Sequence, residues 1–406
     1  MENNYVQKGT AAFRRVNLAL FIGGFVTFAN LYVVQPLMPA FSDEFNTTPA
    51  VASLTLSVTT IFLAIAMLFT GSLSESWGRK GMMEASVIAV SVLAIVLAFA
   101  PGFHSMLVLR ILQGIVFAGL PSIAMAYLGE EIEPSSLGIA MGIYISGNTI
   151  GGLSGRVITG TVADFFDWRT ALIVMGIISL IASLIFYWAL PKSKHFQPRR
   201  LQIKQLIKSM GSHLRNPALL CLYGMGFLLM GSFVTMYNYV EFQLVAPPFS
   251  LSQTLVGWIF IIYLVGTVSS TWFGNLAMKH GRRSMLMLGL FIMFVGALIT
   301  LDTNLFIKIF GMAAFTFGFF ASHSIASGWV GYLAGHDKAQ AASLYLFFYY
   351  FGSSVGGTAG GIFWTDFGWE GVIAMIAGFI LLSFILLVFL SRTVTLAKQE
   401  GTLVSR

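Results

Sequence analysis

Five side chains that can carry a charge interrupt long apolar stretches of the chain: Arg110, Arg156, Glu241, Lys308 and His323. Charge is costly in hydrocarbon, so such residues usually face a protein interior or a water-filled cavity. There an arginine or a lysine can hold an anion, whereas a carboxylate or an imidazole can take up and release a proton. Glu241 and His323 are therefore candidates for proton exchange. The alternative for Glu241 and Lys308, which lie near the ends of their stretches, is that they reach the lipid headgroups.

Uncharged hydrogen-bonding side chains occur in the same apolar stretches. In hydrocarbon these groups need partners, so we expect them to point inward, either toward a bound solute or toward a neighbouring helix. Together with one of the arginines, they form the expected set of substrate-binding residues: Asn30, Tyr32, Gln35, Asn148, Arg156, Tyr237, Asn238, Tyr349 and Tyr350.

The composition excludes a water-soluble protein. Of 406 residues, 57% are apolar and only 10% are charged, whereas soluble domains are about 25% charged. A single cysteine, Cys221, allows no internal disulfide. The chain is therefore expected to be an integral membrane protein.

Twelve apolar runs approach or exceed the roughly 20 residues that a helix needs to cross a bilayer. No ten-residue alternation typical of a membrane β-barrel is present. The first run is too long for the apolar part of a signal peptide. We expect an all-α membrane protein with helices near residues 16–38, 50–72, 82–100, 105–128, 137–163, 170–190, 218–244, 252–276, 284–302, 305–330, 340–363 and 369–390.

Basic residues predict the orientation. Lys and Arg concentrate in cytoplasmic loops of membrane proteins, and 19 of the 23 here fall on one side if the N-terminus is cytoplasmic. Both termini are therefore expected inside the cell, in the cytoplasmic (inner) membrane.

The sequence repeats internally in the same order. Two six-helix halves with a binding site at the midplane are typical of transporters, so we expect two pseudo-symmetric bundles, at 1–190 and 217–406, joined by a cytoplasmic linker at 191–216. The repeat pairs Gly71, Leu73, Gly78 and Arg79 with Gly274, Leu276, Gly281 and Arg282; Asn30, Gln35 and Pro39 with Asn238, Gln243 and Pro247; and Gly147, Gly151, Gly152 and Gly155 with Gly352, Gly356, Gly357 and Gly360.

The linker carries apolar residues at roughly helical spacing. We expect a basic amphipathic helix at the inner membrane surface; the alternative is a solvated linker with some helical bias. The expected apolar face comprises Leu201, Ile203, Leu206, Ile207, Met210 and Leu214.

Three of these segments resemble signatures of the major facilitator superfamily. The segment from Gly71 to Lys80 is similar to the loop signature between helices two and three. Leu107 with Arg110, Gln113 and Gly114 resembles the helix-four signature of proton-coupled members. The segment from Gly147 to Gly155 resembles the helix-five signature of the twelve-helix drug:proton antiporters. It departs from that signature at Gly152, where proline is usual, and at Arg156, where a small residue is usual.

The resemblance implies roles for these residues. Arg110 joins Glu241 and His323 as a proton-coupling residue. The glycines spaced four apart, Gly147, Gly151 and Gly155, share one helix face that allows close packing, either static or sliding. A cytoplasmic latch that biases the conformation of the transporter would comprise Gly71, Glu75, Gly78, Arg79, Glu130 and Glu131; the alternative is that its basic residues only anchor the loop inside.

The leading functional hypothesis is a secondary active transporter that moves a small organic solute by alternating access, with proton-coupled efflux favoured. The main alternative is a carrier for an organic anion or polar metabolite that uses Arg110 and Arg156 as counter-charge. A remote alternative is a non-transporting membrane receptor or scaffold. The sequence contains no catalytic or ATP-binding motif with support, so we expect no enzyme, metal or cofactor, and no nucleic-acid partner. The expected partners are the solute, protons and lipid, the energy source is a proton gradient, and a monomer suffices.

Overall fold

Long helices make up the protein. The computed structural model describes residues 5–198 and 203–399, and these contain no β-strand, only an isolated bridge between Val6 and Ile132. The all-α fold is thus confirmed. The helices that follow the predicted runs are α1 (Ala11–Tyr32), α2 (Met38–Glu44), α3 (Pro49–Trp77), α4 (Arg79–Ala98), α5 (Phe103–Phe117), α6 (Pro121–Glu131), α7 (Leu137–Phe165), α8 (Trp168–Ala189), α9 (Ile203–His213), α10 (Pro217–Val245), α11 (Gln253–Ile259), α12 (Tyr263–His280), α13 (Arg282–Ile299), α14 (Leu305–Leu333) and α15 (Lys338–Gln399).

The helices account for twelve membrane crossings. Ten segments of the described residues are long and apolar enough to span a membrane, with α1 and α2, α5 and α6, and α11 and α12 each joined into one. Within α15 the backbone of Gly368 is not helical (φ 61°, ψ −147°), so this segment contains two helices. The glycine-rich α7, which carries Arg156, is the twelfth.

Three predicted helices are interrupted. The first ends at Tyr32 and continues through a short 3-10 turn, η1 (Gln35–Leu37), into α2. The fourth breaks between Phe117 and Pro121, because proline lacks the amide that a continuous helix needs. The eighth is broken by the 3-10 turn η3 (Phe260–Ile262). The predicted runs therefore located the crossings but not these breaks.

The described part of the linker forms helix α9. Leu206 and Met210 are buried in the protein, whereas Ile207 and Leu214, just beyond the end of the helix, are exposed. Leu201 lies outside the described residues, as does the side chain of Ile203. A position of α9 at the membrane surface stays a prediction.

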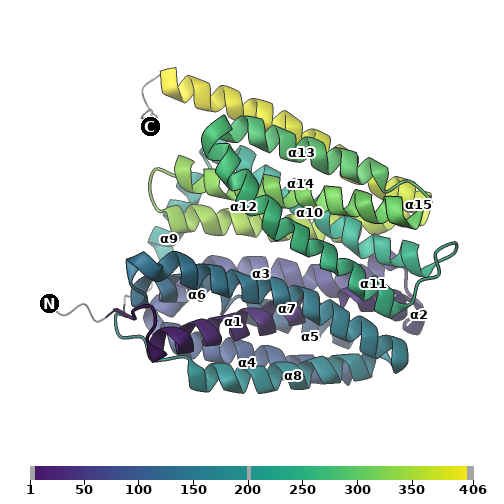
Figure 1. Ribbon diagram of the computed structural model, residues 1–406, viewed down its shortest axis with the longest axis horizontal. Helices are drawn as coiled ribbons and strands as arrows, with labels where there is room; N and C mark the ends of the chain where they lie inside the picture. The colour runs from purple at the N-terminus through teal and green to yellow at the C-terminus, as the bar shows by residue number, and fades with distance from the viewer. Residues whose placement is uncertain (1–4, 199–202, 400–406) are drawn as a thin grey trace. The chain divides into compact units, whose positions relative to one another are not determined.

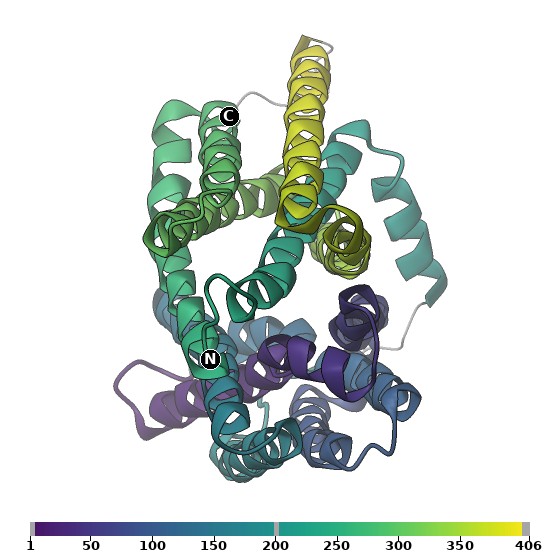
Figure 2. The ribbon, with the colours of Figure 1, turned by 90° about the vertical axis from the view of Figure 1, so that its right-hand side faces the viewer.

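The chain divides into two compact units. Unit 1 comprises Met1–Thr47, Val58–Leu201 and Ser250–Phe260, and unit 2 comprises Thr48–Ser57, Gln202–Phe249 and Ile261–Arg406. Within unit 1, α1 packs on α7 and α8, and α4 packs on α8. Within unit 2, α10 packs on α15, while α14 packs on α12 and α13 (Figure 1). Figure 2 looks onto the end where α10 runs into its connection to α11.

Glycine allows the closest of these contacts. Gly147, Gly151 and Gly155 of α7 lie against the backbone of α1, where an added Cβ would come within 2.3–2.5 Å of a carbonyl oxygen. The predicted shared face is therefore a packing surface between two helices of unit 1. Sliding along this face stays a prediction.

Candidate functional site

A buried cation at the end of α1 organises the polar interior of unit 1. Arg156 of α7 is 1% exposed, and its Nε donates to Oε1 of Gln35 at 2.8 Å. The rings of Tyr32 and Phe260 lie 4.2 and 4.6 Å from its guanidinium carbon, within the range of cation–π attraction. Its Nη1 also donates to the carbonyl of Gly152 at 2.6 Å. Two predicted binding residues, Tyr32 and Gln35, thus contact a third, Arg156.

Arg110 occupies a different place in the same unit. It is completely buried, and it donates to the carbonyls of Asn30 and Leu31 at 3.2 and 2.8 Å and to Gln113 at 2.8 Å. The last carbonyls of a helix lack intrahelical donors and favour a positive charge. Arg110 therefore holds the C-terminal end of α1, and its predicted part in proton coupling stays a prediction.

Two predicted amides in unit 1 contact neighbouring helices. Asn30 donates to Ser179 of α8 at 2.7 Å as well as to the carbonyl of Val26. Asn148 faces α1, since a Cβ on Gly24 would lie 2.3 Å from its Oδ1. These contacts match the interhelical alternative for both residues.

The predicted site residues on α10 lie in the interior of unit 2, among aromatic side chains. Tyr237 is fully buried, and its hydroxyl lies 2.6 Å from that of Thr316 on α14. Asn238 is also buried and contacts Gly357, where an added Cβ would lie 3.1 Å from Nδ2. Glu241, one turn further on, is 0% exposed. The glutamate is therefore inside unit 2, and the alternative of a side chain reaching the headgroups does not describe its position.

His323 belongs to a second group in unit 2. Its Nδ1 lies 3.0 Å from the hydroxyl of Tyr345, and its ring lies 4.6 Å from that of Tyr349. Tyr350 packs edge-on against Tyr349. Tyr237 and His323 are linked through ring contacts of Phe233 and Phe319. An imidazole, phenol hydroxyls and aromatic faces thus lie along one surface of α14 and α15.

The predicted latch residues lie at the other end of unit 1. Arg79 pairs with Glu130 at 2.7 Å and with Glu75 at 3.8 Å. Gly78 has φ 103°, a conformation that favours glycine, and this turn starts α4. The carbonyl of Gly71 accepts a long hydrogen bond from Arg79 at 3.4 Å.

Glu131, which was predicted to belong to the same latch, does not pair with Arg79. Successive helix residues point about 100° apart, so Glu131 faces the segment after α8 instead. It accepts hydrogen bonds from the backbone amides of Lys194 and His195, and from the hydroxyl of Ser193. Glu131 therefore fastens the start of the linker.

Several contacting residues were missed in the sequence: Ser179, Phe260, Thr316 and Tyr345. Each is an ordinary residue of an apolar segment, and only its partner shows its part in the site. Gln113 could have been identified from the sequence, because it belongs to the helix-four signature. No three His, Cys, Asp or Glu side chains among the described residues are grouped as metal ligands would be.

Comparison with known proteins gives consistent matches over the chain. The family model described as Major Facilitator Superfamily matches residues 20–246 and 242–403. The MFS-type transporter YybF of Bacillus subtilis is 53% identical over 397 residues, which cover 98% of each chain. The inner membrane transport protein YnfM of Escherichia coli is 44% identical, over 92% of this chain and 90% of YnfM. A bacterial homologue of the human lysosomal transporter Spinster, in an inward-facing, unoccupied conformation, shares the fold with a TM-score of 0.80 at 14% identity, over 94% of this chain and 97% of that one.

Proposed function

Since the chain belongs to the major facilitator superfamily, and is thus a membrane-embedded secondary transporter and not an enzyme, we propose that it exports a small organic solute in exchange for protons. The proposed cycle is alternating access by a monomer in the cytoplasmic membrane, with both termini in the cytoplasm and the proton gradient as the energy source. The resemblance of the α7 glycine segment to the antiporter signature supports export.

The buried carboxylate of Glu241 carries the proposal. Ionisable groups inside membrane helices are costly and commonly serve ion or proton pathways. Glu241 is 0% exposed on α10, one helical turn from Asn238. A carboxyl group in this environment can change its protonation state when water or a solute reaches it. His323, beside Tyr345, is the second proposed proton carrier.

Proteoliposomes with an imposed pH gradient test the proton coupling. A panel of lipophilic cations, sugars and carboxylates serves as probe, and an entrapped pH dye reports proton movement. Glu241→Gln keeps the shape of the side chain but cannot ionise. We expect it to abolish solute-driven proton flux while exchange of labelled solute continues.

Asp366→Asn is the matched control, because Asp366 is an exposed carboxylate in unit 2. Its proton flux is expected to equal that of the unaltered protein. Undiminished pH-driven transport in Glu241→Gln would remove Glu241 from the mechanism.

Arg156 favours a second candidate, the carriage of an organic anion. Its charge is buried, and Gln35 and two aromatic rings fix its orientation. Preorganised guanidinium groups suit carboxylates because two parallel hydrogen bonds are possible. If the protein carries an organic anion, Arg110 adds positive electrostatic potential within the same unit.

Arg156→Lys separates the two candidates, since lysine keeps the charge but loses the planar fork. We expect carboxylate uptake to fall at least tenfold if the anion binds there, while uptake of cations is unchanged. The matched control is Arg169→Lys, a partly exposed arginine of α8 that lies 3.7 Å from Glu44. Equal losses for anions and cations would assign Arg156 a purely structural role.

A further inference from the structure

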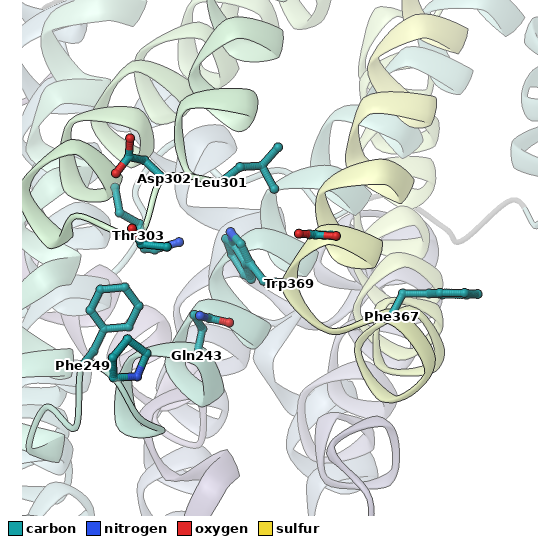
Figure 3. A pocket seen from close by; sticks show the side chains of 10 residues that line it. Gln243, Phe249, Leu301, Asp302, Thr303, Phe367 and Trp369 are labelled. Carbon is teal, nitrogen blue, oxygen red and sulfur yellow. The ribbon is translucent and has the colours of Figure 1, made fainter.

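Unit 2 contains a cleft whose lining does not include Tyr237, Glu241 or His323. Its volume is about 320 Å³, near the lower end of the range for small-molecule sites. Figure 3 shows side chains from three connections converging on it. These are the segment after α10, the loop between α13 and α14, and the break in α15 at Gly368. The residues that line the cleft include Phe249, Asp302, Thr303, Lys308, Trp369 and Glu370.

Lys308 supplies the cleft with a buried positive charge. It is 1% exposed, and its Nζ donates to the carbonyl of Thr300. An ammonium group has three donors. Asp302 acts on this ammonium group electrostatically, but among the residues that the structure describes no carboxylate lies within ion-pair distance of Nζ. A buried charge without an anion in contact is costly, so the site is suited to an anionic group from outside the chain.

Aromatic rings fix this cation in place. The ring of Trp369 lies 5.1 Å from Nζ and that of Phe249 lies 5.5 Å away. The indole Nε1 of Trp369 donates to the same Thr300 carbonyl at 2.9 Å. One carbonyl therefore orients both the lysine and the tryptophan, and the rings leave an apolar wall beside the charge.

The rim of the cleft has the opposite charge. Asp302 and Glu370 are exposed carboxylates from different connections, and Thr303 adds a hydroxyl group. Exposed carboxylates alone would indicate no site. Next to a buried ammonium and an apolar wall, they give the cleft separate positions for an anion, a cation and a hydrocarbon body.

We propose that this cleft binds a small zwitterionic solute with an acidic group, an ammonium group and an apolar body, as in an amino acid. The acidic group contacts Lys308, the ammonium group contacts Asp302 and Glu370, and the body packs on Phe249 and Trp369. The proposal does not depend on proton-coupled export, because it concerns binding and not flux. An occupant would join the ends of α10, α14 and the second part of α15.

Binding to the purified full-length protein in lipid nanodiscs tests the proposal. Calorimetry with three related probes separates the groups: phenylalanine, phenylpropanoate, which lacks the amine, and phenylethylamine, which lacks the acid. We expect phenylalanine to bind best. Lys308→Met should weaken phenylalanine and phenylpropanoate at least tenfold and leave phenylethylamine unchanged. Glu370→Gln should weaken phenylalanine and phenylethylamine but not phenylpropanoate.

Asp366→Asn is the control, because this exposed carboxylate lies near Glu370 in sequence but does not line the cleft. If Lys308→Met fails to fold, Glu370→Gln, a change at an exposed residue, still tests the position of the ammonium group. The test uses phenylpropanoate and phenylethylamine, the two probes that each lack one charged group. The proposal is overturned if no probe binds, or if both variants bind all three probes as the unaltered protein does. A competition experiment with labelled phenylalanine gives a further test. If glycerophosphoethanolamine displaces the label at a lower concentration than unlabelled phenylalanine does, the site holds a lipid headgroup and the proposal is overturned.

Discussion

The α1–α7 pair in unit 1 and the α10–α15 pair in unit 2 are built on the same glycine face. A Cβ on Gly147 would lie 2.3 Å from the carbonyl oxygen of Phe21, and a Cβ on Gly352 would lie 2.0 Å from that of Phe227. These glycines are 205 positions apart, the offset of the glycine segment within the internal repeat. The repeated glycines are thus explained by one steric requirement, the close approach of two helix backbones.

The polar content of the two pairs is different. At the same offset Arg156 corresponds to Gly361, where an added Cβ would lie 2.3 Å from Cα of Ala50. No side chain fits there without movement of the backbone, so unit 2 has no equivalent of the Arg156 cluster. Its interior instead contains Glu241, His323 and aromatic rings. The two helix pairs therefore share a steric scaffold but differ in the polar groups beside it.

The largest expected effect tests the shared scaffold. Gly147→Ala and Gly352→Ala each place a methyl group against a backbone carbonyl, and overpacking of this kind costs about 1–3 kcal/mol or more. We expect both variants to lower the melting temperature by several degrees, which a thermal unfolding assay in detergent measures. Similar losses in both would support a common packing requirement.

Gly142→Ala is the control for this pair. Gly142 is exposed in α7, and a Cβ there meets nothing within 4 Å. Alanine is favoured over glycine in a helix by up to about 1 kcal/mol, so this variant should be as stable as the unaltered protein or slightly more stable. A loss in only one of the two units would contradict the proposed equivalence.

The sequence predicted the parts of the fold that depend on local pattern. Apolar runs located the crossings, and the glycine before the arginine of the repeated loop segment adopts φ 103° at position 78 and 86° at position 281. Both features follow from neighbouring residues alone.

The partners of buried polar groups depend on residues far apart in the chain, and the sequence could not predict them. Arg156 meets Gln35 across 121 positions. Lys308 was given the alternative of reaching the headgroups, but it is buried because the carbonyl of Thr300 and two rings hold it. Glu130 and Glu131 are adjacent, and only their direction around α6 decides which one meets Arg79. These assignments need the rotation of each helix, which hydropathy does not give.

An intermediate effect sharpens the contrast between the two polar interiors. Tyr237→Phe removes a buried hydroxyl that lies 2.6 Å from Thr316, and such a hydrogen bond is worth about 0.5–1.5 kcal/mol. Tyr32→Phe keeps the ring that stacks on Arg156, so a smaller change is expected. Thermal unfolding of both variants, with Thr316→Val completing a double-mutant cycle, measures the difference. Equal losses would show that the hydroxyl of Tyr32 matters as much as its ring.

The ends of the two units near their Gly-Arg turns also differ. Arg79 of unit 1 pairs with Glu130, whereas Arg282 of unit 2 stacks on Tyr332 at 4.2 Å. In unit 2, α9 is fastened through His213, whose ring stacks on that of His336 at 4.7 Å. Ser209 of α9 donates to Asp337 at 2.6 Å. In unit 2 this end therefore depends on a histidine, His213, that can take up a proton.

The smallest expected effect follows from the sign of this titration. Burial of the His213 ring and the neighbouring His336 hold the pKa of His213 below its usual 6.5, although Asp337 acts in the opposite direction. Undocked α9 then binds more protons than docked α9, so docking is favoured above pH 6.5 and weakens as the pH falls through and below that value. The hydrogen bonds from Ser209 and His336 lower the pKa of Asp337 below 3.8, so its contribution is lost only in more acidic solution.

Hydrogen exchange of α9 at pH 7.5 and 5.5, corrected for intrinsic rates, measures this effect. One linked proton gives at most about a tenfold change per pH unit, and the partial opposition of Asp337 places the expected change well below that limit. His213→Gln should abolish the pH dependence, while Lys204→Gln, which removes an exposed charge from the same helix, should retain it. The turn at Arg79 is the internal reference, because its ion pair with Glu130 contains no histidine. Equal pH responses at the two ends would mean that the histidine contact does not govern docking, and the distinction between the units would then be confined to their interiors.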